Sequence, residues 1–206
     1  MKRGKTSKAW MKEHVNDFFV KQAKKEGYRS RAAYKLIEIL ERDHLLTPGM
    51  SVVDLGAAPG GWSQVVAERL KGKGRVIAVD LLEMAPLTGV TFIQGDFREE
   101  AVLAKLKEQL NNSPPDLVIS DMSPNITGIG IIDQTRSVHL AELALEFSVE
   151  QLNSGGNFLV KVFQGSGSDE FLRAMRATFN RVVTRKPGAS RGRSREIYLL
   201  GLGKKK

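Results

Sequence analysis

Five short runs of apolar residues recur along the chain after residue 50, each bounded by Gly, Pro or Asp. Segments with the apolar spacing of helices separate most of these runs. The runs lie at 51–55, 75–80, 90–93, 116–120 and 157–163, and the helical segments near 62–71, 98–110, 134–152 and 168–179. Strands that are apolar on both faces and alternate with helices predict a parallel sheet covered by helices on both sides.

Two more helices are predicted before the first of these strands. They cover residues 17–26 and residues 31–43, and in the second helix four apolar residues fall on one face. A Thr-Pro-Gly turn at 47–49 then breaks the chain. The connection at 81–89 is short and contains a proline, so we expect at most a vestigial helix between the second and third strands.

The last two apolar runs, 181–184 and 196–202, are joined by a turn-like segment that is too short for a crossover helix. Strands connected in this way pair antiparallel. We therefore expect an α/β, Rossmann-like fold with a mostly parallel seven-stranded sheet, helices on both faces and one reversed strand in an edge hairpin. Residues 29–206 are expected to form a single domain with a basic C-terminal tail. Residues 1–28 are expected to form a basic N-terminal extension that is partly disordered.

Composition narrows the class of protein. The 206 residues are 41% hydrophobic and 27% charged, as in ordinary soluble globular proteins. There is no cysteine, which excludes disulfides, thiolate zinc sites, iron–sulfur clusters and thiol catalysis. No apolar run approaches the ~18 residues of a membrane span, and the basic N-terminus lacks the apolar core of a signal peptide. We expect a cytoplasmic protein with no membrane partner.

The net charge of +9 is unevenly distributed. Residues 1–35 hold 11 Lys and Arg against 3 acids, and residues 181–206 hold 9 against 1. The body of the chain, 36–180, holds 12 against 19 and is therefore acidic. Two basic ends on an acidic body predict a polyanionic partner held by the ends, with solvated tails as the simpler alternative.

A glycine-rich loop follows the first strand and opens a helix, where open α/β sheets bind their ligands (54–62, DLGAAPGGW). Gly56 and Gly61 have the spacing of a phosphate-binding loop, but Trp62 stands where that motif needs lysine. The dinucleotide motif also fails, because Ala58 replaces its second glycine. S-adenosylmethionine remains, because it carries a ribose and an adenine but no phosphate.

Two carboxylates stand at strand ends where such a cofactor needs them. Asp80 ends the second strand and is placed to accept both ribose hydroxyls. Asp96 follows the third strand, beside Phe97, where its oxygen can accept the adenine amino proton. An aspartate at such a position can also simply cap a helix. The cofactor site is therefore indicated by the glycine-rich loop together with both aspartates, and not by either aspartate alone.

Other polar residues suggest chemistry near the same edge. Asp121 closes the fourth strand in S-D-M-S-P-N, a motif without the aromatic residue that base-amine methyltransferases carry there. Lys161 lies inside an otherwise apolar strand, which is costly unless it is paired or points into a site. Its alternative is an edge-strand lysine that reaches solvent. Glu196 begins the last strand, and Lys35 lies on the second predicted helix.

These segments resemble the FtsJ-type ribose 2′-O-methyltransferases, in particular those that modify a uridine of large-subunit (23S) ribosomal RNA. The resemblance spans residues 29–198 and is carried by RSRAAYKLIEI (29–39), VVDLGAAPGGWSQ (52–64), QGDFR (94–98), SDMSPN (120–125), VKVFQG (160–165) and RKPGASRGRSREIY (185–198). It implies the fold of S-adenosylmethionine-dependent methyltransferases and transfer of a methyl group to a ribose 2′-hydroxyl.

The resemblance also assigns roles to residues. The Lys-Asp-Lys-Glu tetrad of the family falls on Lys35, Asp121, Lys161 and Glu196. The expected cofactor-binding residues are Gly56, Gly60, Trp62, Asp80, Asp96, Phe97 and Asp121. Ser123 stands where alanine is common in the family, a change of one hydroxyl.

The tetrad makes chemical sense for a ribose hydroxyl, which is a poor nucleophile and needs a base in the right position. Lys161 is the candidate base, because burial and a second cation, Lys35, both favour a neutral amine. Asp121 would orient Lys161 and lie near the sulfonium. Glu196 would position Lys35 or the ribose.

Both basic ends reach this site, because Lys35 and Glu196 belong to them. The cations expected to hold RNA phosphates are Arg29, Arg31, Lys186, Arg191, Arg193 and Arg195. Such contacts position the RNA without specifying its sequence. Tyr28 and Tyr34 are expected either to stack on a flipped-out base or to pack in the core or rim.

Two alternatives stay open. The same fold and tetrad would serve a methyltransferase of transfer RNA or of the messenger RNA cap. A non-catalytic RNA-binding factor for ribosome assembly is the second alternative, which the intact loop and tetrad disfavour. The three histidines are scattered and indicate no metal site. We expect a monomer that acts on the assembled or assembling large ribosomal subunit or on its RNA.

Overall fold

A computed structural model describes residues 17–206 except 125–126, 128–129 and 192–193. Most of the expected N-terminal extension, residues 1–16, therefore lies outside the described residues, as does Arg193. The first described element is helix α2 (Phe18–Glu26). It begins at Asp17, whose carboxylate accepts a hydrogen bond from the Phe19 N–H at 3.0 Å. This is the N-cap contact that aspartate commonly provides.

Seven strands form one sheet in the order β3-β2-β1-β4-β5-β7-β6. Their bounds are β1 Ser51–Leu55, β2 Arg75–Asp80, β3 Thr91–Gln94, β4 Leu117–Ser120, β5 Asn157–Phe163, β6 Phe179–Arg185 and β7 Glu196–Lys204. Strands β1 to β5 pair in parallel, and β7 is antiparallel to both β5 and β6. The predicted fold class is confirmed, including the single reversed strand. That strand lies inside the sheet, and β6 forms the edge.

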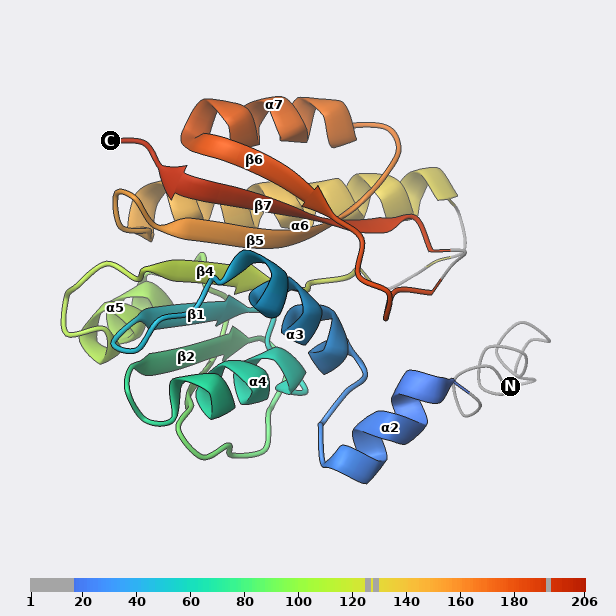
Figure 1. The fold of residues 1–206 in the computed structure, drawn as a ribbon. Helices are drawn as coiled ribbons and strands as arrows, with labels where there is room; N and C mark the ends of the chain where they lie inside the picture. The colour runs from blue at the N-terminus through green and yellow to red at the C-terminus, as the bar shows by residue number, and fades with distance from the viewer. Residues whose placement is uncertain (1–16, 125–126, 128–129, 192–193) are drawn as a thin grey trace.

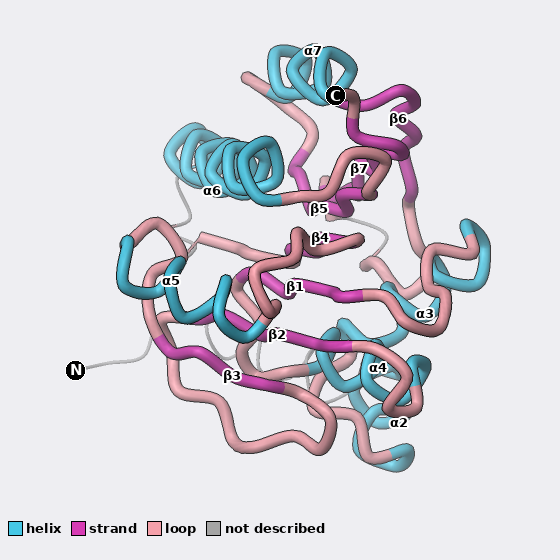
Figure 2. Tube along the Cα trace, turned by 90° about the vertical axis from the view of Figure 1, so that its left-hand side faces the viewer, coloured by secondary structure: helices cyan, strands magenta, loops and turns pink. Residues whose placement is uncertain are grey.

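Helices cover both faces of the sheet (Figures 1 and 2). Helices α3 (Ala32–Asp43) and α4 (Gly61–Leu70) pack on one face, where their apolar residues join one core cluster. Helices α5 (Glu100–Gln109), α6 (Gly130–Gln151) and α7 (Ser168–Thr178) pack on the other face around a second cluster. Among the described residues, none of these helices is long and apolar enough to cross a membrane.

The elements differ from the sequence predictions mainly at their ends. The connection between β2 and β3 contains no helix, as its proline suggested. Strand β6 runs from Phe179 to Arg185, three residues longer than predicted, because it pairs with β7 along its whole length. Its outer face is exposed, so polar residues such as Asn180 and Arg181 interrupt the apolar pattern on which the prediction relied.

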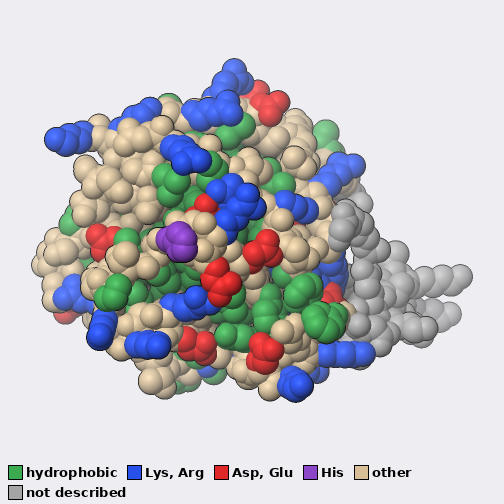
Figure 3. All heavy atoms as spheres, viewed as in Figure 1, with side chains coloured by type: hydrophobic (Ala, Val, Ile, Leu, Met, Phe, Trp, Pro, Cys, Tyr) green, Lys and Arg blue, Asp and Glu red, His purple; other side chains and the backbone are tan. Residues whose placement is uncertain are grey.

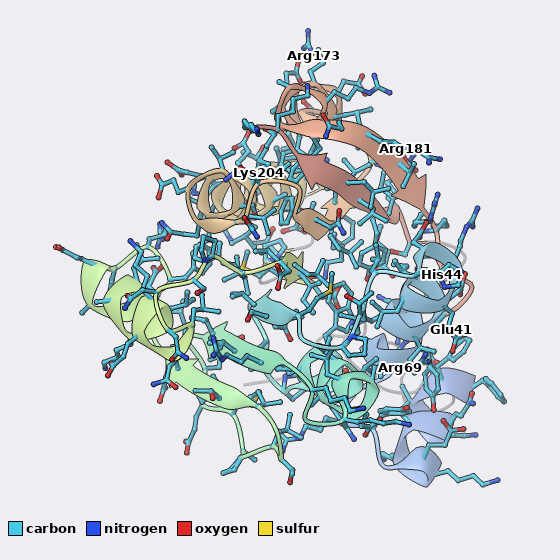
Figure 4. The ribbon with its side chains drawn as sticks, turned by 60° about the vertical axis from the view of Figure 1, so that its left-hand side comes forward. Glu41, His44, Arg69, Arg173, Arg181 and Lys204 are labelled. Atoms are coloured by element: carbon cyan, nitrogen blue, oxygen red, sulfur yellow. The ribbon has the colours of Figure 1, made fainter. Side chains whose placement is uncertain are left out.

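Charged side chains fix the layers to one another. Arg69 on α4 lies 2.6 Å from Glu41 on α3, and both side chains are labelled in Figure 4. Arg185 at the end of β6 donates from its Nε to Asp43 on α3 at 2.8 Å, and this pair is largely buried. Lys204 Nζ donates to the Leu152 carbonyl at 2.7 Å, at the C-terminal end of α6, where a cation complements the helix dipole.

Gly201 of β7 supplies a first prediction. A Cβ at this position would lie 2.5 Å from the ring of Phe179 on the neighbouring strand. Gly201→Ala should therefore lower the free energy of unfolding by about 1–3 kcal/mol through overpacking, as measured by urea denaturation. Gly130→Ala is the matched control, because its Cβ meets nothing within 4 Å and alanine favours the helix. Equal stability of the two variants would contradict the prediction.

Candidate active site

The carboxyl ends of β1, β2, β4 and β5 meet at one edge of the sheet, and the reversed strand β7 begins there. This arrangement explains how residues far apart in the sequence come together. Asp80 ends β2, Asp121 follows β4, Lys161 lies near the end of β5, and Glu196 is the first residue of β7. Helix α3 packs across the same end and adds Lys35.

Lys161 and Asp121 form a direct pair. The Nζ atom of Lys161 lies 3.1 Å from the Asp121 carboxylate oxygen Oδ1 and donates to the Asp121 backbone carbonyl at 2.6 Å. Lys161 is 6% exposed, so its ammonium reaches the site and not bulk solvent. The sequence alternative of an edge lysine in solvent is therefore wrong, because β7 covers β5 on that side.

Lys35 and Glu196 form a second buried pair. Lys35 Nζ lies 2.6 Å from Glu196 Oε1, and both residues are buried. Burial works to raise the pKa of Glu196, but the positive charges of Lys35 and Lys161, together with the hydrogen bond from Lys35, lower it below its usual value. Glu196 is therefore held as a carboxylate that balances the two lysines.

Tyr198, to which no sequence motif assigns a role, joins the two pairs. Its hydroxyl donates to Asp121 Oδ1 at 2.8 Å, and Lys35 Nζ lies 5.9 Å from the centre of its ring. Burial and the neighbouring charge of Asp121 raise its pKa well above the usual value, so the phenol stays a hydrogen-bond donor. The sequence does contain a signal for Tyr198. Residues two apart in a strand share a face, so Tyr198 points the same way as the candidate site residue Glu196.

A cavity of about 560 Å³ opens beside these residues. It runs across the ends of β1, β2 and β4, and its walls come from the loops that follow them. The expected cofactor residues that line it are Gly56, Asp80, Asp96, Phe97 and Asp121. Gly56 has a φ of +72°, and a side chain there would collide with Met122. Only glycine leaves this wall open.

The two cofactor carboxylates already hold parts of the protein. Asp80 accepts hydrogen bonds from the Ala58 and Leu82 N–H groups, both at 2.8 Å, and so fixes the loops on either side of the cavity. Asp96 is bound by the side chain and N–H of Arg98, and these hydrogen bonds lower its pKa. Both carboxylates lie at the cavity wall.

Gly60 and Trp62 lie outside the cavity lining. The Trp62 indole N–H donates to the Ala32 carbonyl at 2.9 Å, and its ring lies 5.6 Å from that of Tyr198. Its side chain thus packs α4 against α3 in the core. Gly60 is the N-cap of α4, with φ of +103°, beneath Met84 and Leu87. Any cofactor contact made by these two residues would have to come from their backbone.

Asp54 is a buried carboxylate to which no sequence motif assigns a role. It lies in β1, is 1% exposed, and accepts a hydrogen bond from Ser63 Oγ at 2.7 Å. Burial raises its pKa to about 7, and the negative charges of Asp121 and Asp80 act in the same direction, against the Ser63 hydrogen bond. A fourth acid therefore lies close enough to Asp121 and Asp80 of the cavity lining to interact with their charges.

The described residues of the basic loop (186–191 and 194–195) lie next to Glu196, whose N–H donates to Ser194 Oγ at 3.2 Å. The loop backbone is anchored to α3, since the Gly188 N–H donates to Glu38 at 2.7 Å and Arg31 donates to the Ala189 carbonyl. Lys186 donates to the Ser194 carbonyl at 2.7 Å. These contacts hold the described part of the loop in place.

Most of the expected RNA-binding cations have partners within the protein. Arg31 and Arg191 both contact the carboxylate of Asp17, the latter at 3.3 Å. Arg29 donates to the carbonyls of Pro59, Ala85 and Pro86 and so ties together two cavity loops. Arg195 is exposed. Figure 3 shows Lys and Arg side chains with interspersed acids on the face of the molecule seen in Figure 1.

Tyr28 and Tyr34 pack against each other between α2 and α3. Their ring centres lie 5.6 Å apart, Tyr34 also contacts Phe19, and its hydroxyl donates to Glu26 at 2.8 Å. This arrangement favours the packing role over stacking on a base. Among the described residues, no group of three His, Asp or Glu side chains is arranged to hold a metal ion.

Comparison with known proteins finds one family and several similar chains. The model of the FtsJ-like methyltransferase family matches residues 28–204. The chain is 83% identical over 205 residues to the ribosomal RNA large subunit methyltransferase E of Nitrosospira multiformis, with 100% of both chains covered. It is 65% identical over 202 residues to the protein of that name from Methylobacillus flagellatus, with 98% of each covered.

A solved structure is similar as well. A ribosomal RNA methyltransferase from Plasmodium falciparum superimposes with a TM-score of 0.78 at 35% sequence identity, covering 86% of this chain and 98% of the other.

The buried Asp54 generates a pH-dependent prediction. Its pKa is about 7 in the folded protein and about 3.9 in an unfolded chain. The folded state therefore binds the extra proton between these values, and Asp54 makes the protein less stable as pH rises through that window. The stability of Asp54→Asn relative to the wild type should rise from pH 4 to pH 7 and then level off. Urea denaturation at four pH values measures this, and a difference that is constant with pH would contradict it.

Proposed function

Because the chain belongs to the FtsJ-like methyltransferase family, we propose that it transfers a methyl group from S-adenosylmethionine to the ribose 2′-hydroxyl of a uridine in large-subunit (23S) ribosomal RNA. That the chain is a methyltransferase follows from the family. The observation that carries the proposed chemistry is the joining of Lys35, Asp121, Lys161 and Glu196 in two ion pairs, in which Asp121 lines the cavity and the other three are buried. We further propose that the protein works as a monomer in the cytoplasm, on the large subunit or its RNA.

The cavity suits a cationic cofactor without phosphate. Asp80, Asp96 and Asp121 line it, and Arg98, the one cation among its described lining residues, is paired with Asp96. A pyrophosphate would meet carboxylates there without compensating positive charge, whereas a sulfonium and an α-ammonium would be attracted. Asp80 would accept the ribose hydroxyls, Asp96 the adenine amino group, and Gly56 would leave room for close approach. Bound there, S-adenosylmethionine would supply an electrophilic methyl group.

Lys161 is arranged to act as the base. A neutral amine has two N–H bonds and one lone pair. The carbonyl and Oδ1 of Asp121, at 2.6 and 3.1 Å from Nζ, can take both N–H bonds. The lone pair is then left to accept the proton of the 2′-hydroxyl, while its oxygen forms the new bond to the methyl carbon and the bond from that carbon to sulfur breaks. Asp121 orients the amine, and Tyr198 fixes Asp121.

Lys35 and Glu196 serve the substrate side of the site. Their ion pair lies beneath the basic loop, where a ribose and its phosphates would enter. Lys35 offers a positive charge to the developing oxyanion, and Glu196 keeps that charge in position. Arg31, Arg191 and Arg195, near the same opening, would contact RNA phosphates. Such contacts make binding steeply dependent on salt.

Lys161→Ala tests the base. Because the variant lacks the proton acceptor but keeps the cavity, methyl transfer should fall by about 100-fold or more. Cofactor affinity, measured by isothermal titration with S-adenosylhomocysteine, should stay within a few-fold of the wild type. Lys105→Ala on the exposed face of α5 is the control. If Lys161→Ala keeps a tenth of the wild-type rate, Lys161 is not the base.

The substrate needs a separate experiment. Methyl-labelled S-adenosylmethionine is incubated with large subunits from cells that lack the enzyme, and with the same RNA stripped of protein, and the RNA is digested to nucleosides. We expect label in 2′-O-methyluridine, and the better substrate shows when the enzyme acts. Label in another nucleoside would overturn the assignment, and cofactor binding without any label would favour the assembly factor. Protection from heat by S-adenosylhomocysteine but not by NAD would support the cofactor.

A further inference from the structure

The solvent-facing side of α2 has no role in the proposed reaction or in the fold. Phe18 at its start is 70% exposed, and Lys21, Lys24 and Lys25 are exposed as well. Phe18, Lys21 and Lys25 are spaced by three and four residues, so they share one face of the helix. In the space-filling view, hydrophobic and basic side chains lie next to one another over α2 (Figure 3).

The packing of α2 leaves this face free. Val20 and Ala23, on its opposite side, are buried, and Phe19 packs on Tyr34. Its one acid, Glu26, already accepts hydrogen bonds from Gln22 at 2.9 Å and from Tyr34 at 2.8 Å. Within the described part of the chain, none of the three lysines has an ion pair. The face thus presents an exposed aromatic ring among uncompensated positive charges.

Asp17 connects α2 to the mouth of the site. Its Oδ1 caps the helix, and its Oδ2 binds Arg31 and Arg191. Arg31 in turn holds the Ala189 carbonyl of the basic loop, which covers Glu196. Figure 1 shows α2 at the end of the molecule toward which β1 and β4 point. The exposed face of α2 is therefore fixed next to the region where RNA would enter.

We infer that this face of α2 binds single-stranded RNA beside the target nucleotide, with Phe18 stacked on an unpaired base and Lys21 and Lys25 on neighbouring phosphates. The inference rests on the proposed RNA substrate and extends its binding surface beyond the cations around the site. Aromatic rings interleaved with basic residues are the usual means of holding single strands. Lys21 and Lys25 are about 6 Å apart along the helix axis, which suits successive contacts on one strand.

A protein partner fits this face less well. Lysine is depleted in the buried centres of protein interfaces, because a buried ammonium loses its hydration without a partner. Lys21 and Lys25 beside Phe18 would each need an acid on the other protein. A phosphate backbone supplies such acids at regular intervals and at any sequence.

The contribution of Lys21 and Lys25 to RNA binding is tested by the salt dependence of the affinity. Binding of the full chain to protein-free large-subunit ribosomal RNA is measured by filter retention at several salt concentrations. If each lysine contacts a phosphate, Lys21→Gln with Lys25→Gln should reduce the slope of log K against log salt by about 1.4 to 1.8. Lys105→Gln with Lys107→Gln is the matched control on exposed positions of α5, across the sheet from α2 (Figure 2). An unchanged slope in the α2 variant overturns the inference.

The ring is tested separately. Phe18→Ala should weaken RNA binding about tenfold without changing the salt slope, because stacking carries no charge. Phe18→Trp should bind as well as the wild type, whereas Phe18→Leu should bind like the alanine variant. If Phe18→Leu binds like the wild type, the contact is not a stacking one. Melting temperatures of all variants should match, since Phe18 is exposed.

Two further outcomes separate this inference from the proposed function. Wild-type protein that binds neither the free RNA nor the large subunit at low salt contradicts the proposed function itself, and the inference with it. Wild-type protein that binds, with α2 variants that bind equally well, overturns the inference alone. If the α2 variants lose affinity only for the assembled subunit and not for its free RNA, the partner of α2 is a ribosomal protein, and the inference is again wrong.

Discussion

Two buried lysines at one end of the sheet are the constraint on which the rest of this structure depends. An ammonium group taken out of water is very costly unless a partner compensates it. Lys161 is compensated by Asp121 and Lys35 by Glu196, and the hydroxyl of Tyr198 binds the acid of the first pair. Each partner comes from a different part of the chain. The elements that carry them must therefore be placed accurately, or a charge is left unpaired.

The reversed strand β7 makes this placement possible. A parallel strand at this position would deliver its carboxyl end to the site and would need another crossover. Because β7 is antiparallel, its first residue, Glu196, lies at the site, and the loop before it covers the opening. The pairing of Lys161 with Tyr198 across β5 and β7 puts both side chains on the face that α3 covers, where Lys35 meets them. The antiparallel direction of β7 thus places Glu196 and Tyr198 where the two buried lysines need them.

Much of this arrangement could be predicted from the sequence, and the failures have physical causes. Apolar runs located β1, β2 and β5 to the residue, because central parallel strands are buried on both faces. The edge strand β6 was predicted too short, because its outer face carries polar residues. Lys161 stood out because a lysine in an apolar strand is unusual. Tyr198 did not stand out, because a tyrosine in an apolar strand is a common residue of a hydrophobic core. The partners of Arg29 and Arg31 depend on loop carbonyls and on Asp17, which no local pattern indicates.

The division of charge at this end of the sheet follows from the two reactants that the proposed reaction brings together. The carboxylates of Asp80, Asp96 and Asp121 lie on the cofactor side and create a negative field in the cavity. Lysines and arginines from α2, α3 and the basic loop lie on the other side. A cationic methyl donor and an anionic RNA are thus each attracted to its own half and repelled from the other. In the proposed reaction the sulfur loses its positive charge when the methyl group is transferred. The carboxylates would therefore attract the demethylated product less strongly than the donor, so the same negative field favours release of the product.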